Sequence, residues 1–132
     1  MLPKFVLRIL IPLSWAVIIA YLSLMPQRSL PHPHWFNFEN SDKLVHLAMY
    51  AKLAAVMYRA ALIRTTVSIR SLLLIVMICG VFGLFIEVMQ ERFTSDRTFD
   101  WIDALFNVIG AGVSAGVCKL LPNKIFLSHY KI

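Results

Sequence analysis

The chain has 132 residues, of which 59% are hydrophobic and 15% are charged, and its mean hydropathy is +0.72. Because a soluble domain carries about 25% charged residues, this composition excludes a soluble globular class and indicates one small integral membrane domain, residues 1–132. The net charge of +6 does not indicate nucleic-acid binding, since Lys and Arg lie between hydrophobic segments rather than on one exposed face.

Four apolar segments follow one another along the chain, at residues 9–25, 44–63, 72–89 and 101–121. Each has close to the roughly 20 residues that a helix needs to cross about 30 Å of hydrocarbon. We therefore predict an all-α integral membrane protein, a bundle of four transmembrane helices. The first segment follows a short basic start without a small-x-small cleavage site, which predicts an uncleaved signal anchor.

The charges are sorted by position along the chain. Basic residues precede the first segment, separate the second from the third, and end the fourth: Lys4, Arg8, Arg59, Arg64, Arg70, Lys119, Lys124 and Lys131. All seven acids fall on the opposite side: Glu39, Asp42, Glu87, Glu91, Asp96, Asp100 and Asp103. The positive-inside rule then predicts that both termini are cytoplasmic and that the acidic loops face outward.

The loop between the first two segments contains Pro26, Pro31 and Pro33, which disfavour regular structure. Trp35 and Phe36 in this loop are predicted to lie at the level of the lipid headgroups.

The second segment carries polar residues at helical spacing. Ser41 is a plausible helix cap, and Asp42, His46 and Tyr50 recur every four residues along one face. Lys52 falls near the middle of the bilayer, where two interpretations remain open: it pairs with Glu87, or it reaches toward the interface.

The stretch from Glu87 to Asn107 is a polar region between two apolar segments. Glu87 and Gln90 share one helix face, and the connection at residues 91–98 is short enough to make the third and fourth helices antiparallel neighbours. Asp100, Asp103 and Asn107 share a face of the fourth helix. If these helix ends converge, they form a polar pocket that opens to the outer leaflet.

These residue types suit a phosphate or another polar lipid headgroup. Arg97 is a planar donor to an oxyanion, His46 is an acid or base near neutral pH, and Glu87 is predicted to hold or transfer a proton. Asn107 and Gln90 are orienting amides.

Two alternatives compete with this interpretation. The sequence predicts no cofactor, and a divalent cation bound by Glu87, Asp103 and His46 is the less favoured option, because no two of them have a spacing diagnostic of a metal site. In the purely structural alternative, Arg97 pairs with Asp100 or Asp103 and Asn107 bonds across helices.

Three stretches of the chain resemble the VanZ-like membrane proteins: LSLMPQRSLP, SDKLVHLAMY and EVMQERFTSDRTFDWIDALFNVIGAG. The resemblance runs from about residue 9 to about residue 116. It implies a four-helix protein of the bacterial inner membrane, in a family named for a member associated with low-level resistance to the glycopeptide teicoplanin. The motif residues it carries over are Asp42, Lys43, His46, Tyr50, Glu87, Gln90, Arg97, Asp103, Asn107 and Gly110.

Three functions follow as hypotheses. The first is an enzyme or binder of a membrane lipid or lipid-linked envelope precursor, with His46, Glu87, Asp103 and Arg97 as candidate catalytic residues and Asp42, Lys43, Tyr50, Gln90, Asp100 and Asn107 as candidate ligand-binding residues. The second is a non-catalytic protein that masks a surface lipid or a lipophilic antibiotic through Trp35 and Phe36. The third, proton or ion movement, rests on Lys52 and Glu87 alone. Association into a homo-oligomer is compatible with all three.

Overall fold

The computed structural model describes residues 4–26, 29–30, 38–62 and 66–127, and all regular structure within them is helical. Trp35 and Phe36, which the sequence predicts to lie at headgroup level, fall outside the described residues, as do Pro31, Pro33, Arg64 and Lys131. For the part of the chain that the structure describes, the all-α prediction is confirmed.

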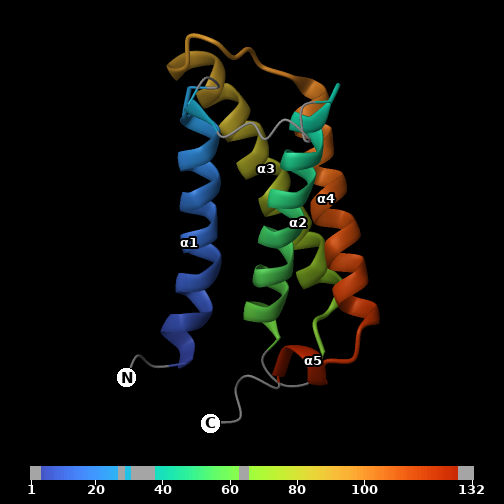
Figure 1. Ribbon diagram of the computed structural model, residues 1–132. Coiled ribbons are helices and arrows are strands. Elements are labelled where there is room, and N and C mark those ends of the chain that lie inside the picture. The colour runs from blue at the N-terminus through green and yellow to red at the C-terminus, as the bar shows by residue number, and fades with distance from the viewer. Residues whose placement is uncertain (1–3, 27–28, 31–37, 63–65, 128–132) are drawn as a thin grey trace.

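Four long helices form the bundle, and a single-turn helix follows them. They are α1 (Lys4–Leu24), α2 (Ser41–Ala61), α3 (Ile69–Phe93), α4 (Trp101–Leu120) and α5 (Lys124–Leu127). At the top of Figure 1, α1 and α3 end while α2 and α4 begin; we call this the polar end of the bundle. α3 runs obliquely from the lower part of α4 to the end of α1, so its connection to α4 arches across the polar end (Figure 1).

The helix ends differ from the predicted ones for local reasons. α3 begins earlier because Ser68 caps it, its Oγ accepting the Ser71 N–H at 3.1 Å. α3 also continues to Phe93, so Glu91, which was predicted to lie in the connecting loop, is helical. The predicted Ser41 cap is wrong: the N-cap of α2 is Asn40, whose φ of 65° is left-handed, without a side-chain capping bond.

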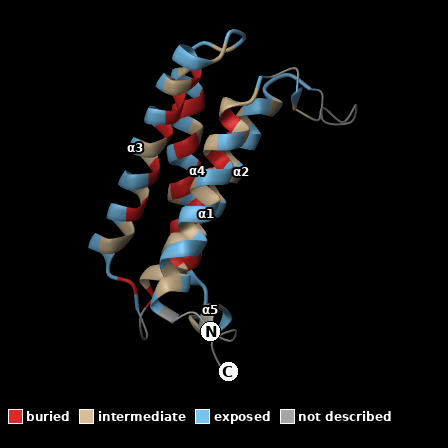
Figure 2. Cartoon of the chain, turned by 90° about the vertical axis from the view of Figure 1, so that its left-hand side faces the viewer, coloured by how far each residue is buried: buried red, intermediate tan, exposed pale blue. Residues whose placement is uncertain are grey.

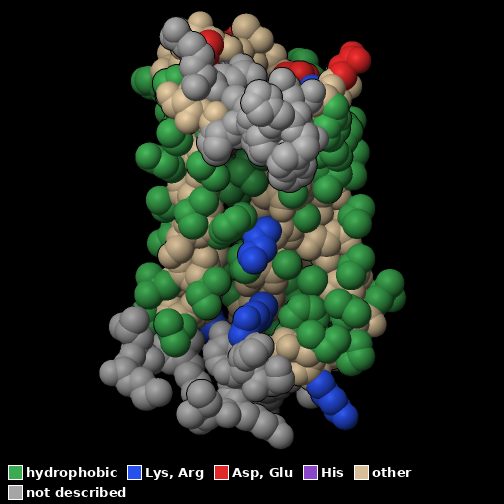
Figure 3. Space-filling view, in the orientation of Figure 1, with side chains coloured by type: hydrophobic (Ala, Val, Ile, Leu, Met, Phe, Trp, Pro, Cys, Tyr) green, Lys and Arg blue, Asp and Glu red, His purple; other side chains and the backbone are tan. Residues whose placement is uncertain are grey.

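Three helices among the described residues, α1, α3 and α4, are long and apolar enough to cross a membrane. α2 does not meet that criterion, because Asp42, Lys43, Lys52 and Arg59 interrupt its apolar residues. Apolar side chains cover most of the visible face between the two ends, and acidic side chains show only at the polar end (Figure 3). The chain is therefore a helical membrane protein whose most polar long helix lies among more apolar ones.

The tightest packing in the bundle joins α2 to α4. A Cβ added to Gly110 would lie 2.3 Å from the carbonyl oxygen of Leu47, so the two backbones touch at this glycine. Ala111 and Ala115, one turn apart on α4, are fully buried. Figure 2 shows buried residues along α2, α3 and α4, whereas α1 is exposed over most of its surface. Small residues thus let α2 and α4 approach each other closely.

Candidate functional site

Lys43 ties the first turn of α2 to the start of α4. Its Nζ lies 3.0 Å from Asp103 Oδ1, 3.1 Å from Asp100 Oδ2 and 3.7 Å from Asp42 Oδ2. The side chains of Lys43 and Asp103 are only 13% and 12% exposed, so each charge reduces the cost of burying the other. Lys43 therefore takes the place that the structural alternative gave to Arg97, which forms no ion pair with any described residue.

Asp100 starts α4 as its N-cap rather than lying on the helix face where the sequence placed it. Its Oδ1 accepts the Ile102 N–H at 2.7 Å, and its Oδ2 pairs with Lys43. These two contacts, the Ile102 N–H first, hold the pKa of the Asp100 carboxyl below its ordinary value. Capping and ion pairing thus use the same carboxylate to join two helix N-termini.

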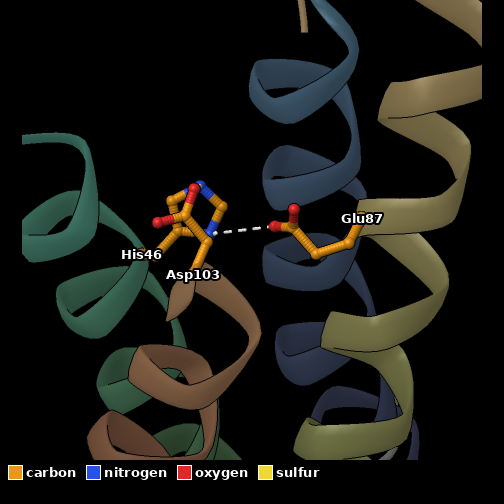
Figure 4. Close-up of side chains that lie close together, drawn as sticks. All are labelled: His46, Glu87 and Asp103. Atoms are coloured by element: carbon orange, nitrogen blue, oxygen red, sulfur yellow. Dashed lines mark ion pairs between the residues drawn. The ribbon is translucent and has the colours of Figure 1, made fainter. Parts of the chain in front are cut away.

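The imidazole of His46 lies among three oxygen acceptors. Its Nδ1 is 3.1 Å from Asn107 Oδ1 and 3.6 Å from Glu87 Oε1, and its Nε2 is 3.9 Å from Asp103 Oδ2. Because an amide oxygen only accepts, Nδ1 carries the proton in the bond to Asn107. In Figure 4, Glu87 of α3 points across the bundle at the His46 ring of α2, with Asp103 of α4 beside the ring.

Glu87 is the most deeply buried carboxylate of the site, with 1% of its surface exposed. Its Oε2 accepts the backbone N–H of Asp100 at 3.4 Å, which links the end of α3 to the start of α4. Its Oε1 is buried and has no hydrogen-bond partner among the described residues. A buried carboxylate oxygen without a donor is costly unless a proton or a cation compensates it.

A cavity of about 580 Å³ opens beside these residues at the polar end. One part of its lining is apolar and includes Leu22, Leu30, Phe38, Val45 and Met49. The other part is polar and includes His46, Gln90, Arg97, Asp100 and Asp103. A cavity with these two linings suits a molecule that has both a polar and an apolar portion.

Arg97 reaches the cavity from the connection between α3 and α4. Its Nε is buried and has no hydrogen-bond partner among the described residues, so the hydrogen-bonding capacity of this donor is unused. Gln90, predicted to be an orienting amide, is 2% exposed and donates its Nε2–H to the Ser23 carbonyl at 2.9 Å. This bond fastens the end of α3 to the end of α1.

Two residues that the sequence associated with the site do not line the cavity. Tyr50 is fully buried in the apolar core, with its ring centroid 6.1 Å from that of Phe82, and does not line the cavity. Lys52 is exposed and places its Nζ 5.5 Å from the ring centroid of Trp15. It forms no ion pair with Glu87, so the first of its two interpretations is wrong.

Sequence reasoning missed two contributors to the site. Ser23 is 3% exposed, lines the cavity and supplies the carbonyl that holds Gln90. Its only signal was a polar residue in the last turn of an apolar helix. Gly83 makes room for Asn107, because a Cβ there would lie 2.8 Å from Asn107 Nδ2. Its only signal in the sequence was a glycine four residues before Glu87 in an apolar segment.

The site can also be viewed as a set of ligand atoms. His46, Glu87 and Asp103 each offer one atom, and the three atoms lie within 4.8 Å of one another. They come from α2, α3 and α4 respectively, and all three residues are buried. The arrangement therefore permits proton transfer between an imidazole and carboxylates, or coordination of a cation.

A comparison with protein-family models matches residues 5–122 to the family described as VanZ/LLP1. This match spans nearly all of the 132 residues and includes every residue of the site. No curated protein and no solved structure gives a significant match to the chain.

Proposed function

The chain belongs to the VanZ/LLP1 family, and from that premise and the geometry of the polar end we propose that it binds a cell-envelope lipid or lipid-linked precursor in the bacterial inner membrane. The observation that carries this proposal is the cavity, which joins a buried, unpartnered Arg97 Nε to a lining of apolar side chains. An anionic headgroup would pair with the guanidinium, and the hydrocarbon chain would lie against the apolar lining.

The proposal includes an orientation in which all four long helices span the membrane, both termini are cytoplasmic and the polar end faces outward. Charge supports it. Six basic residues and no acid lie at the opposite end of the described chain: Lys4, Arg8, Arg59, Arg70, Lys119 and Lys124. α2 can span as well, because Asp42 and Lys43 lie in its first turn and Arg59 in its last turn, while Lys52, midway, is exposed beside the Trp15 ring.

The orientation can be tested at Ser95, which is exposed in the connection between α3 and α4. In intact cells, a Ser95→Cys variant should react with a membrane-impermeant maleimide. The two native cysteines, Cys79 and Cys118, are buried and serve as the unreactive background. Labelling only after the cells are opened would contradict the outward orientation.

Lipid binding is tested by mass spectrometry of lipids retained on protein purified in mild detergent. We expect Arg97→Gln to lose most of the retained anionic lipid, because it removes the guanidinium charge from the cavity. Arg92→Gln is the matched control, since Arg92 is exposed in the last turn of α3 and does not line the cavity. Equal lipid retention by both variants would contradict the proposed role of Arg97.

A second candidate function is acid–base chemistry on the bound lipid. It is favoured by the position of His46, which lines the cavity and lies 3.6 Å from Glu87 and 3.9 Å from Asp103. In this role His46 would take or give a proton while the carboxylates stabilise its charged form. Glu87→Gln and His46→Ala should then retain lipid but stop its conversion, and finding only unchanged lipid on the parent protein would favour binding alone.

We extend the proposal to glycopeptide susceptibility. A protein that binds or alters an outward-facing lipid changes the composition of the membrane surface to which a lipophilic antibiotic binds. Expression of the parent should then raise the inhibitory concentration of teicoplanin, and Arg97→Gln should remove the increase. The same inhibitory concentration with and without the protein would limit the function to lipid binding.

A further inference from the structure

We propose that His46, Glu87 and Asp103 bind one divalent transition-metal ion, such as Zn²⁺, at the base of the cavity. The three residues come from three helices and offer one nitrogen and two oxygen ligands. Imidazole and carboxylate together suit ions of this class. This proposal goes beyond lipid binding and does not depend on which molecule fills the cavity.

Each of the three side chains has one polar atom held by the protein and one that is not. Asn107 Oδ1 holds Nδ1 of His46 at 3.1 Å, and Lys43 holds Oδ1 of Asp103 at 3.0 Å. The backbone N–H of Asp100, the N-cap residue of α4, donates to Oε2 of Glu87 at 3.4 Å. The remaining atoms are His46 Nε2, Asp103 Oδ2 and Glu87 Oε1. In protein metal sites, hydrogen bonds to the non-coordinating atom of a ligand side chain fix the orientation of that side chain.

The atoms that remain are all acceptors, and no described residue donates a hydrogen bond to them; the N–H on Nδ1 of His46 lies 3.6 Å from Oε1 of Glu87, beyond hydrogen-bond distance. With its proton on Nδ1, the neutral ring presents the Nε2 lone pair to Asp103 Oδ2 at 3.9 Å. Oε1 of Glu87 is buried in a side chain that is 1% exposed, and it has no hydrogen-bond partner among the described residues. A cation among these atoms would remove the repulsion and satisfy the unpaired oxygen.

The separations set an expectation for how the site responds. Ligands about 2.1 Å from a tetrahedral ion lie about 3.4 Å apart. Each of the three residues offers an atom within 4.8 Å of the other two, so a bound ion would draw α2, α3 and α4 slightly together. Metal binding should therefore stabilise the fold as well as fill the site.

The charge of the region also favours a dication. Among the described residues, four carboxylates of the cluster and the cavity are accompanied by two cations: Asp42, Glu87, Asp100 and Asp103 against Lys43 and Arg97. Lys43 is engaged on the far oxygen of Asp103 and leaves the near one open. A divalent ion would offset most of the remaining negative charge.

The ligand count leaves room for a substrate. Three protein ligands leave a tetrahedral ion with one open position, which is the arrangement of catalytic rather than structural zinc sites. His46 and Asp103 line the cavity, so the open position would face it. An ion bound there would supply a Lewis acid for an oxygen of a bound headgroup.

The competing explanation is an imidazolium. A protonated His46 would face the same two carboxylates with a second N–H in place of a metal ion. The two explanations differ in their response to a chelator, because only a metal site releases an ion and regains it.

The test uses the full chain purified in detergent, treated with a chelator and titrated with Zn²⁺, with Mn²⁺ and Mg²⁺ in parallel. We expect one Zn²⁺ per chain, a dissociation constant of about 1 µM or lower and a rise in the melting temperature. X-ray absorption at the zinc edge should show one nitrogen and two oxygen ligands from the protein. Glu87→Gln should weaken binding at least about a hundredfold.

Two controls separate this site from others. Glu91→Gln removes an exposed carboxylate one turn along α3, and His32→Ala with His34→Ala removes the two imidazoles of the proline-rich sequence between the first two apolar segments. Both should bind Zn²⁺ like the parent. The proposal is overturned if chelated parent protein takes up no Zn²⁺, or if a folded Glu87→Gln variant binds it unchanged.

If Glu87→Gln does not fold, the X-ray absorption spectrum of the zinc-loaded parent tests the proposal instead. A ligand set without imidazole overturns it. Lipid retention is measured on the same chelated protein, so failure of metal binding and failure of lipid binding give separate results.

Discussion

The two sides of α2 present the same kind of side chain to different surroundings. On the side that faces α4, the ammonium of Lys43 contacts three carboxylates within 3.7 Å. On the side that faces α1, Lys52 has no carboxylate partner among the described residues and lies 5.5 Å from the ring centroid of Trp15. The ammonium of Lys43 is therefore paired with carboxylates, whereas that of Lys52, nine residues further along the same helix, lies at an apolar surface.

The difference extends to the packing of the backbone. The contact of α2 with α4 is so close at Gly110 that it leaves no space for a Cβ, whereas a groove of about 530 Å³ lies along Trp15, Met49 and Lys52. Figure 3 shows basic side chains surrounded by apolar ones on the face of the bundle. The α4 side of α2 is thus packed closely enough to hold a fixed arrangement of polar groups, whereas the α1 side leaves an open, largely apolar groove.

The largest expected effect comes from filling the contact between α2 and α4. Gly110→Ala places a Cβ 2.3 Å from the Leu47 carbonyl oxygen, so the helices must separate. We expect a loss of about 4 kcal/mol in the free energy of unfolding, measured by denaturation in mixed micelles. Gly116→Ala is the matched control, because no atom lies within 4 Å of its added Cβ, and equal losses would show that the contact is not tight.

Substituting Lys43 and Lys52 in turn tests the comparison directly. Lys43→Met leaves Asp100 and the largely buried Asp103 without their cation, which we expect to cost about 3 kcal/mol. Lys52→Met should change stability by less than about 0.5 kcal/mol, because it loses only a contact with an aromatic ring. The same micelle denaturation measures both, and similar costs for the two variants would break the comparison.

A smaller effect is expected on the α1 side. Trp15→Phe removes the hydrogen bond that Nε1 donates to the Met49 carbonyl at 2.9 Å and keeps an aromatic ring beside Lys52. The loss of this bond should cost about 1 kcal/mol. Zn²⁺ affinity and lipid retention should stay at parental levels, since the polar end is not touched; a change in either would show that α1 positions the site.

The smallest effect concerns pH. The pKa of Asp100 is lowered by the Ile102 N–H and Lys43, so its charged form stabilises the fold. This contribution is complete above the ordinary value of about 3.9 and is lost as the pH falls through the lower folded pKa. The melting temperature should therefore fall below about pH 4, and Asp100→Asn, which keeps a capping oxygen, should reduce that fall. An identical pH profile for the variant would assign the effect to other carboxylates.

Much of the fold could be predicted from local sequence. The length of the apolar runs placed the four helices within a few residues of their observed bounds, because a run of about 20 apolar residues has few other solutions in a membrane. Helical spacing also placed His46, Glu87 and Asp103 toward one end of their helices. The bounds failed where capping decided them, as at Ser68 and Asn40.

Other features depended on how the helices turn toward one another. Spacing along one helix cannot say that Lys43 rather than Arg97 meets Asp103, or that Lys52 faces Trp15 rather than Glu87. Those outcomes follow from the rotation and tilt of whole helices, which the close approach at Gly110 and the oblique path of α3 set.

By itself, the sequence determined a helical membrane protein of the VanZ/LLP1 family with its acids gathered at one end. Only the tertiary structure decided that His46, Glu87 and Asp103, from three different helices, face one another. The sequence spacing of a ligand set is diagnostic only when its members share an element. Here each residue comes from a different helix, so the packing of the helices alone brings the three together.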